Sequence, residues 1–266
     1  MQEHDIHRIA AEIFAAGQRR DRFEPLTGDN KPASLEQAYR IQDEVYRLFS
    51  SEGGLGPLGG HKIALTSQAV QQLCGVTEPA YGAIFKSQLY SSGYRVKASD
   101  FARLGLEFEI AVELGDDVPE GRDDWTRDTI APYVHACMPA FELIEDRNAD
   151  YTQLDAASIL TDRCWCVGAV QGEKNLQWRD LNLAECDSQL WINGEQLDQG
   201  KTGDSMGHPL NGLAWIARHL SRQGRRLRRG EIIMTGSALK TRVATPGDSV
   251  EYRVAGLGKV VVEIDT

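Results

Sequence analysis

The sequence has neither a long apolar run nor an excess of positive charge. No stretch approaches the roughly 18 apolar residues of a membrane span, and the N-terminal segment MQEHDIHRIAAEIF lacks the apolar core of a signal peptide. Acidic residues outnumber basic ones by 39 to 29, which gives a net charge of −10 at pH 7. We therefore expect neither nucleic acid nor an anionic membrane as the main partner.

Cysteine is also scarce. The chain has five cysteines, an odd number, among 266 residues, and a chain of this length buries enough surface to fold without disulfides. Cys164 and Cys166 have no second cysteine or histidine pair at zinc spacing, so we do not expect a zinc site. Because the cytoplasm is reducing, we expect free thiols and a cytoplasmic protein.

Two short motifs occur without the context that their chemistry needs. Gly54, Gly56 and Gly59 spell the dinucleotide-binding pattern, but they precede a predicted strand instead of following one. Residues 203–207 (GDSMG) spell the nucleophile elbow of serine hydrolases, yet no hydrophobic strand precedes them. We interpret both segments as loops.

What the chain does contain is a helical start and a β-rich remainder. Apolar residues recur at helical spacing over residues 5–20 and 34–49. Residues 104–114 instead alternate strictly between apolar and other residues, which predicts a strand. Further strands are expected at 61–65, 141–145 and 164–170, and in three segments near the C-terminus.

Residues typical of turns and helix starts complete the predicted organisation. Asn193-Gly194 predicts a hairpin turn, and Pro209 begins a predicted helix that ends at about residue 220. The sequence shows no internal repeat and no long linker. We therefore predict a helical arm, residues 1–50, packed on a β-rich catalytic domain, residues 51–266.

The strand over residues 104–114 carries an acidic face. Glu107, Glu109 and Glu113 alternate with its apolar residues, and same-face neighbours lie about 6.6 Å apart. Glu142 stands in a second apolar run, where a carboxylate needs a partner. Two interpretations stay open: a solvent-facing acidic edge, or three carboxylates (Glu107, Glu109 and Glu142) around Mg²⁺ or Mn²⁺, which prefer oxygen ligands.

Lys62 is the third candidate element of a site, because it stands in the apolar segment HKIAL. A partly buried lysine near a metal has a depressed pKa and can exchange protons. The alternative is a lysine at a strand end that extends its ammonium into solvent.

Seven segments, taken together, resemble one enzyme family in order and spacing. They are GHKIALTS (60–67), GV (75–76), YG (81–82), LEFE (106–109), PAFE (139–142), GHP (207–209) and TGS (235–237). The set resembles the 2-keto-4-pentenoate hydratase and 4-oxalocrotonate decarboxylase family, which belongs to the fumarylacetoacetate hydrolase superfamily. The resemblance extends from about residue 34 to the C-terminus.

The resemblance implies an α+β fold: a mixed β-sandwich roll of the fumarylacetoacetate hydrolase type with an N-terminal helical arm. It also implies a homo-oligomer built from dimers and a divalent cation, Mg²⁺ or Mn²⁺. The positions that match the family's site are Glu107, Glu109 and Glu142 for the metal, Lys62 as the catalytic residue, and Thr66 and Ser67 for substrate binding.

The implied function is a metal-dependent lyase acting on a 2-oxo or 2-hydroxydienoic acid in aromatic-compound catabolism. The first interpretation is hydration of 2-hydroxypenta-2,4-dienoate, or a related acid, to a 4-hydroxy-2-oxo acid. The metal would hold the carboxylate and keto oxygens of the small-molecule 2-oxo acid and act as a Lewis acid, while Lys62 shuttles a proton.

Two alternatives stay open. Hydratases of the family commonly have Asp-Tyr-Gly where this chain has AYG (80–82), which favours a 4-oxalocrotonate-type decarboxylase, although GS at 236–237 is more hydratase-like. The family's Ala-Asp-Asn is replaced by ASI at 157–159. The other alternative is a non-catalytic partner subunit in a complex with a related hydratase or decarboxylase.

Overall fold

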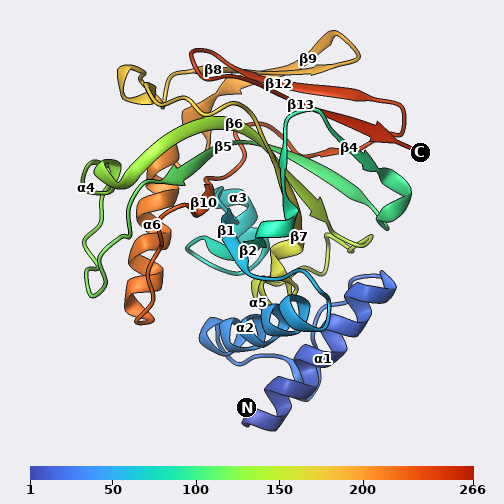
Figure 1. The fold of residues 1–266 in the computed structure, drawn as a ribbon. Coiled ribbons are helices and arrows are strands. Elements are labelled where there is room, and N and C mark those ends of the chain that lie inside the picture. Colours follow the sequence, from blue (N-terminus) through green and yellow to red (C-terminus); the bar gives the residue numbers. More distant parts are fainter.

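Two β-sheets form the body of the protein, and a pair of N-terminal helices lies at one end of it (Figure 1). The computed structural model describes residues 1–266. None of its helices combines the length and the apolar character that crossing a membrane requires. The α-helices are α1 (Glu3–Arg19), α2 (Leu35–Ser51), α3 (Gln68–Leu73), α4 (Arg127–Ile130), α5 (Ala156–Thr161) and α6 (Pro209–Arg222).

The larger sheet has eight strands, in the order β2-β1-β10-β5-β6-β7-β3, with β11 beside β5. The β1–β10 and β3–β7 pairs are parallel and the other pairs are antiparallel. Its strands are β1 (Leu58–Ala64), β2 (Ala80–Phe85), β3 (Leu89–Ser91), β5 (Leu104–Leu114), β6 (Val134–Glu145), β7 (Cys166–Gln171), β10 (Ile232–Met234) and β11 (Arg242–Val243).

This larger sheet curls into a roll. Four strands separate β2 from β7 in the sheet order, yet β2 packs against β7. Because side chains alternate along a strand, Glu107 and Glu109 share the inner face of the roll with Ala111. The apolar part of that inner face is one buried cluster of mostly small side chains: Ile84, Ala111, Ala136, Met138, Ala140, Cys166, Ala169, Ile232 and Met234.

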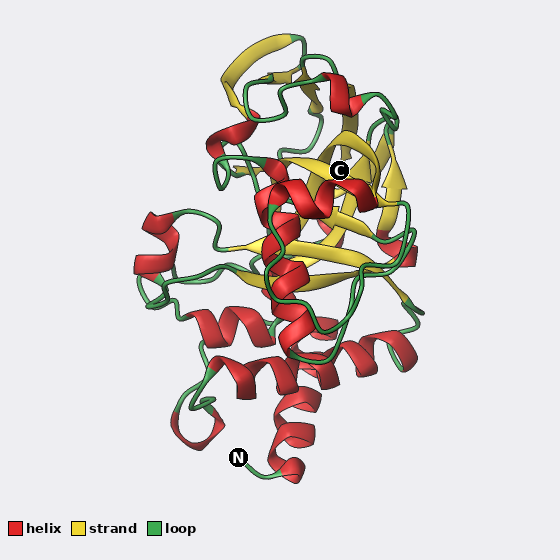
Figure 2. Ribbon diagram, turned by 90° about the vertical axis from the view of Figure 1, so that its left-hand side faces the viewer, coloured by secondary structure: helices red, strands yellow, loops and turns green.

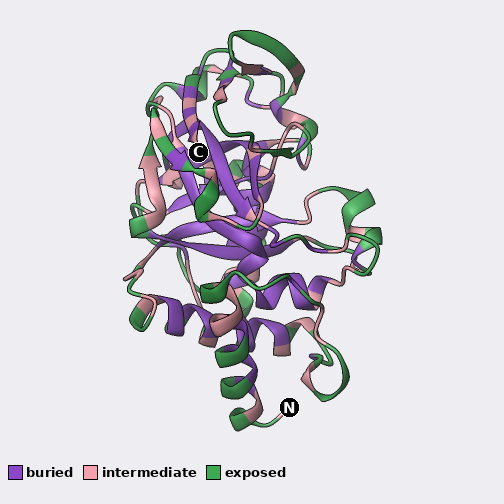
Figure 3. Ribbon diagram, turned by 90° about the vertical axis from the view of Figure 1, so that its right-hand side faces the viewer, coloured by how far each residue is buried: buried purple, intermediate pink, exposed green.

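The outer face of β5 and β6 packs on the second sheet. The rings of Phe108 and Phe141 lie 5.7 and 6.3 Å from that of Tyr252. Figure 2 shows the layered strands edge-on, and in Figure 3 the central strands are the most deeply buried part of the chain. The second sheet has the order β4-β13-β12-β8-β9, with β4 (Tyr94–Lys97), β8 (Asp187–Ile192), β9 (Glu195–Lys201), β12 (Ser249–Val254) and β13 (Gly258–Asp265).

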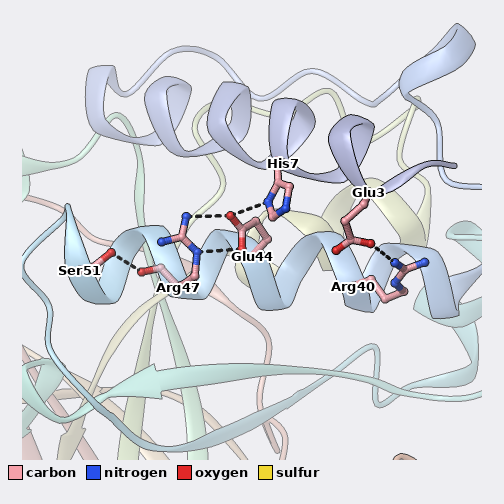
Figure 4. Close-up of polar contacts among 6 residues, drawn as sticks. All are labelled: Glu3, His7, Arg40, Glu44, Arg47 and Ser51. Atoms are coloured by element: carbon pink, nitrogen blue, oxygen red, sulfur yellow. Dashed lines mark hydrogen bonds and ion pairs between the residues drawn. The ribbon is translucent and has the colours of Figure 1, made fainter.

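Helices α1 and α2 attach to the roll through apolar packing. Ile9, Ile41 and Phe49 form a buried cluster with Phe85 of β2. The polar contacts between the two helices, such as Arg40–Glu3 at 2.5 Å and His7–Glu44 at 2.9 Å, lie on the surface (Figure 4), where an ion pair contributes about 0–1 kcal/mol. The boundary between an arm at residues 1–50 and a domain at 51–266 stays a prediction.

The predicted fold class is confirmed, and most predicted elements are present. The strand at 104–114 and the helices at 5–20, 34–49 and after Pro209 occur within a few residues of the expected bounds. Asn193 and Gly194 form the expected turn between β8 and β9, both with positive φ, 52° and 85°. One strand prediction needs correction, because the strand expected at 164–170 begins only at Cys166, after a 3₁₀ turn.

Candidate functional site

Three glutamates meet on the inner face of the roll. Glu107 and Glu109 lie on β5 and Glu142 on β6, and one carboxylate oxygen of each lies within 4.8 Å of the others. Glu107 and Glu142 are direct cross-strand partners. Like charges placed opposite each other destabilise a sheet, so this acidic cluster, Glu107–Glu109–Glu142, needs positive charge nearby.

Burial makes a positively charged partner for these carboxylates more necessary. Glu109 and Glu142 are 0% exposed, whereas Glu107 is only half-buried. Burial, together with the charge of Glu107, raises the pKa of Glu142 to about 7 despite the nearby Lys62. Burial and the two neighbouring carboxylates raise the pKa of Glu109 well above its ordinary value. Glu109 Oε1 and both oxygens of Glu142 have no aligned hydrogen-bond donor, although buried carboxylates are normally paired.

Lys62 reaches the acidic cluster across the roll. Two strands separate β1 from β6 in the sheet order, a separation of roughly 14 Å along a flat sheet. The Nζ atom of Lys62 nevertheless lies 3.0 Å from Oε1 of Glu142. The curvature of the sheet, and not its strand order, brings this pair together.

The carboxylates around Lys62 set the direction of its pKa. Burial alone would lower the pKa of Lys62, but the carboxylates of Glu142 and Glu107 raise it above the ordinary value. The depressed pKa expected beside a bound cation stays a prediction. The side chain is only 4% exposed, so the alternative of an ammonium extended into solvent is wrong.

Two residues that the sequence analysis did not assign a role hold the acidic cluster in place. The backbone N–H of Gly236 donates to Oε2 of Glu109 at 2.7 Å, and Thr241 Oγ1 donates to Oε1 of Glu107 at 2.9 Å. Gly236 has φ +102°, and a Cβ there would lie 2.4 Å from Ser205 Oγ. Only glycine can therefore supply this donor without a shift in its neighbours.

A cavity of about 210 Å³ opens beside the acidic cluster. Lys62 and Glu107 line its polar part, and the two predicted substrate-binding residues, Thr66 and Ser67, line it as well. The Ser67 hydroxyl accepts the Val70 N–H at 3.3 Å and so caps α3. A larger groove of about 550 Å³ lies elsewhere, beside Glu113 of β5 and Met138 of β6, and none of the acidic cluster lines it.

One wall of this cavity rests on strained backbone. Arg163, Cys164 and Trp165 have consecutive φ values of 59°, 49° and 61°, a left-handed turn that costs non-glycine residues about 1–2 kcal/mol each. Cys164 and Trp165 line the cavity. Gly82 permits the turn, since a Cβ at that position would lie 2.7 Å from the carbonyl oxygen of Arg163. Strain of this kind is typical of functional sites.

The residues of the acidic cluster fit a divalent cation. They offer hard oxygen ligands from two neighbouring strands. Oε1 of Glu109 and Oε2 of Glu142 are buried without a donor, and a cation would satisfy them. The structure thus brings Lys62, Thr66 and Ser67 to the cavity beside the three glutamates. The individual roles of these residues stay predictions.

Comparison with known proteins gives the same family as the resemblance. The model of the fumarylacetoacetate hydrolase C-terminal family matches residues 65–265. The 2-keto-4-pentenoate hydratase of Paraburkholderia xenovorans is 30% identical over 257 residues, which cover 97% of this chain and 94% of that protein. The 2-oxo-hept-4-ene-1,7-dioate hydratase of Escherichia coli is 27% identical over 97% of both chains.

Solved structures share the fold. The 4-oxalocrotonate decarboxylase of Pseudomonas putida G7, complexed with magnesium and adipate, superposes with a TM-score of 0.91 at 24% identity and covers 99% of this chain and 98% of its own. The fumarylpyruvate hydrolase of Pseudomonas aeruginosa, in complex with Mn²⁺ and pyruvate, has a TM-score of 0.59 at 13% identity and covers 77% of this chain and 88% of its own. With its family model matched over most of the sequence and a relative aligned over nearly its full length, the chain belongs to the fumarylacetoacetate hydrolase family.

Proposed function

We propose that this protein is a divalent-metal-dependent lyase acting on a 2-oxo or 2-hydroxydienoic acid. The preferred reaction is hydratase-like, and the preferred substrate is 2-hydroxypenta-2,4-dienoate or a related acid in aromatic-compound catabolism, with a 4-hydroxy-2-oxo acid as the product. The full-length relatives named as hydratases support this choice of reaction. Mg²⁺ or Mn²⁺ is the proposed cofactor.

One observation carries the proposal: a buried lysine and three carboxylates meet beside a single cavity, which Lys62 and Glu107 line. Lys62 Nζ lies 3.0 Å from Glu142, and the three carboxylates lie within 4.8 Å of one another. A purely structural ion pair needs one carboxylate for one ammonium. The two further carboxylates, one of them fully buried, support a metal-ligand role.

The proposed mechanism assigns a task to each group of residues. Glu107, Glu109 and Glu142 hold the divalent cation, which when bound supplies Lewis acidity toward a 2-oxo acid. Lys62 Nζ holds the proton that is exchanged with the substrate carbon, because it is the one ammonium lining the cavity. The hydroxyls of Thr66 and Ser67 line the same cavity and orient the substrate carboxylate.

A specific residue favours a second candidate, a 4-oxalocrotonate-type decarboxylase. Ala80 begins β2 and is 2% exposed, so it offers no acid or base where hydratases of the family commonly have an aspartate. Hydration needs a group that activates water, whereas loss of carbon dioxide does not. The third candidate is a non-catalytic subunit of a hydratase or decarboxylase complex, for which the same alanine would mark lost chemistry.

The test is direct. Purified protein with Mg²⁺ or Mn²⁺ is mixed with 2-hydroxypenta-2,4-dienoate or with 2-oxohex-3-enedioate, and dienol absorbance and carbon dioxide are followed. Loss of the dienol without carbon dioxide supports the hydratase, and carbon dioxide release supports the decarboxylase. Metal binding without turnover of either acid would leave the partner subunit as the better proposal.

Replacing Glu109 tests the metal site. Glu109→Gln removes a charged ligand but keeps the shape and the acceptor for the Gly236 N–H. We expect the fold to persist and Mg²⁺ binding, measured by calorimetry, to disappear. Unchanged Mg²⁺ affinity would contradict the assignment of Glu109 as a ligand.

Replacing Lys62 tests the proton carrier. Lys62→Met fills a similar volume without a proton, and we expect metal binding to persist while turnover falls at least about 100-fold, the usual range for a lost acid or base. Circular dichroism controls for folding, since Glu142 loses its ion-pair partner. Full activity of the variant would remove the proposed role.

We also propose a cytoplasmic homo-oligomer built from dimers. The five cysteines are all free and buried, which supports a reducing compartment. Light scattering on the purified protein measures the assembly, and a monomer at micromolar concentration would contradict it.

A further inference from the structure

The left-handed turn of Arg163, Cys164 and Trp165 is not favoured by its own residues. None of the three is glycine, yet each has a positive φ, a conformation that persists only where the surrounding structure enforces it. The turn brings Cys164 and Trp165 to the cavity beside the acidic cluster. The contacts that enforce the turn therefore also determine the position of this wall of the cavity.

Helix α2 contacts the first residue of the turn. It packs against α5, the helix that precedes the turn (Figure 1), and the guanidinium of Arg163 lies 3.9 Å from the centre of the Phe49 ring. Both side chains are buried, and Nε of Arg163 has no hydrogen-bond partner. The attraction between a cation and an aromatic ring is strongest away from water, so Phe49 holds the side chain of Arg163 against α2.

The segment between α1 and α2 contacts the last residue of the turn. The ring of Phe23 packs edge-on against that of Trp165, with the ring centres 5.2 Å apart. The N–H of Phe23 donates to the carbonyl oxygen of Arg147 at 3.0 Å. Arg147 in turn donates to Asp162, the residue directly before the turn, at 2.6 Å. These contacts connect the helical arm to both ends of the turn.

A further contact connects α2 to the middle of the turn. Nε2 of Gln42, a fully buried side chain on α2, donates to the carbonyl oxygens of Tyr81 and Leu160. The Tyr81 oxygen also accepts the Cys164 thiol at 3.4 Å. None of the arm residues that make these contacts lines the cavity, so they can act on a ligand only through the turn.

We propose that the helical arm is part of the substrate site, because it holds the left-handed turn in the shape that the ligand needs. Phe49 and Phe23 are the positioning residues, and they act through Cys164 and Trp165. This role is additional to the apolar packing that attaches α1 and α2 to the roll. The inference rests on the proposed function, because it takes the cavity beside the acidic cluster as the place where the substrate binds.

Thiol labelling tests the hold on the turn without any ligand. Cys164 is 2% exposed and burial raises the pKa of its thiol to about 12, so the wild type should react slowly with a maleimide. Phe49→Leu keeps an apolar side chain but removes the ring. We expect it to label Cys164, located by mass spectrometry, at least about fivefold faster. Cys137 on β6, which is 0% exposed, should stay as slow as in the wild type and controls for opening of the whole core.

Ligand binding tests the consequence for the site. The affinities of the Mg²⁺-loaded protein for pyruvate and 2-oxohexanoate are measured by calorimetry. Pyruvate occupies little of the cavity beyond its metal end, whereas the longer chain of 2-oxohexanoate extends toward the turn. We expect Phe49→Leu to weaken 2-oxohexanoate binding at least about fivefold. The affinities for pyruvate and for Mg²⁺ should not change, because the acidic cluster lies on β5 and β6.

Ile9→Ala is the matched control. Ile9 is 0% exposed on α1 and belongs to the same buried cluster as Phe49, but the turn is contacted from α2 and from the segment before it. Both variants should have lower melting temperatures. Only Phe49→Leu should change Cys164 labelling and the preference for 2-oxohexanoate over pyruvate. If Phe49→Leu does not fold, Phe23→Leu removes the other ring and takes its place.

The outcomes separate this inference from the proposed function. Unchanged Cys164 labelling in the folded variant would show that the arm does not hold the turn, and would overturn the inference while the proposed function stands. Faster labelling with an unchanged preference between the two acids would also overturn it, since the turn would then not shape the site. If neither acid binds to the wild type with metal, the proposed function fails, and the role of the turn in substrate binding fails with it.

Discussion

His61 is expected to make the stability of this protein fall steeply in mild acid. The side chain is 5% exposed beneath the Tyr81 ring, and its Nδ1 atom has no hydrogen-bond partner. Glu231 lies 3.9 Å from Nε2, beyond hydrogen-bond reach. Burial and the charge of Arg225 therefore dominate, and they lower the pKa of His61 to about 3.

The size of the effect follows from proton linkage. In the unfolded chain the imidazole titrates near its ordinary pKa of 6.5, against about 3 in the folded protein. Between these values the unfolded state binds one proton more than the folded state, so stability is complete above pH 6.5 and is lost as the pH falls toward 3. At pH 5 the loss amounts to about 2 kcal/mol.

Urea unfolding at pH 7.5 and pH 5 measures this difference. The variant His61→Leu has a similar volume and no titrating group, so we expect its loss of stability between the two pH values to be smaller than that of the wild type by about 2 kcal/mol. His4→Leu is the matched control, because the side chain of His4 is 79% exposed. This variant should lose as much stability between the two pH values as the wild type. Equal acid sensitivity of His61→Leu and the wild type would refute the reasoning.

Glycine positions supply the remaining predictions. Gly82→Ala forces a Cβ to within 2.7 Å of the Arg163 carbonyl oxygen, and we expect about 1–3 kcal/mol of destabilisation with weaker 2-oxo acid binding, measured by thermal melts and calorimetry. Gly60→Ala is expected to prevent folding, since its Cβ would lie 1.9 Å from the Ile232 carbonyl oxygen where β1 pairs with β10; a soluble variant with a native melting temperature would contradict this. Gly28 has φ +56°, but an added Cβ would have no atom within 4 Å. Gly28→Ala should therefore lower the free energy of unfolding by only about 1 kcal/mol, and it is the control for backbone strain without a clash.

Local patterns were sufficient for much of the fold. The strand at 104–114 was predicted at its observed bounds because its outer face is uniformly apolar and packs on the second sheet. β2 was missed, since every residue of AYGAIF is buried and both faces therefore look alike in sequence. Cys164 was misassigned to a strand, because nothing in a sequence pattern indicates three successive left-handed residues.

Only part of the candidate site could be predicted from the sequence. Alternation placed Glu107 and Glu109 on one face of a strand, apolar neighbours singled out Glu142 and Lys62, and the resemblance matched all four to the family's site. What sequence could not provide is the curl of the sheet, which turns that face inward and brings Lys62 across to Glu142. The contacts of Gly236 and Thr241 with the glutamates follow from the pairing of β10 and β11 with β5, which sequence does not show either. The sign of the Lys62 pKa shift depends on the curl.

The residues in and beside the cavity belong to elements of unequal robustness. The carboxylates lie on β5 and β6, which are paired with each other along nearly their whole length, whereas Val70 and Leu73 lie on a six-residue helix without a buried side chain. Amide hydrogen exchange should accordingly be slow in the former and fast in the latter. Changes in α3 can therefore accumulate without disturbing the carboxylates, which leaves this scaffold free to evolve new substrate preferences while its reaction chemistry is retained.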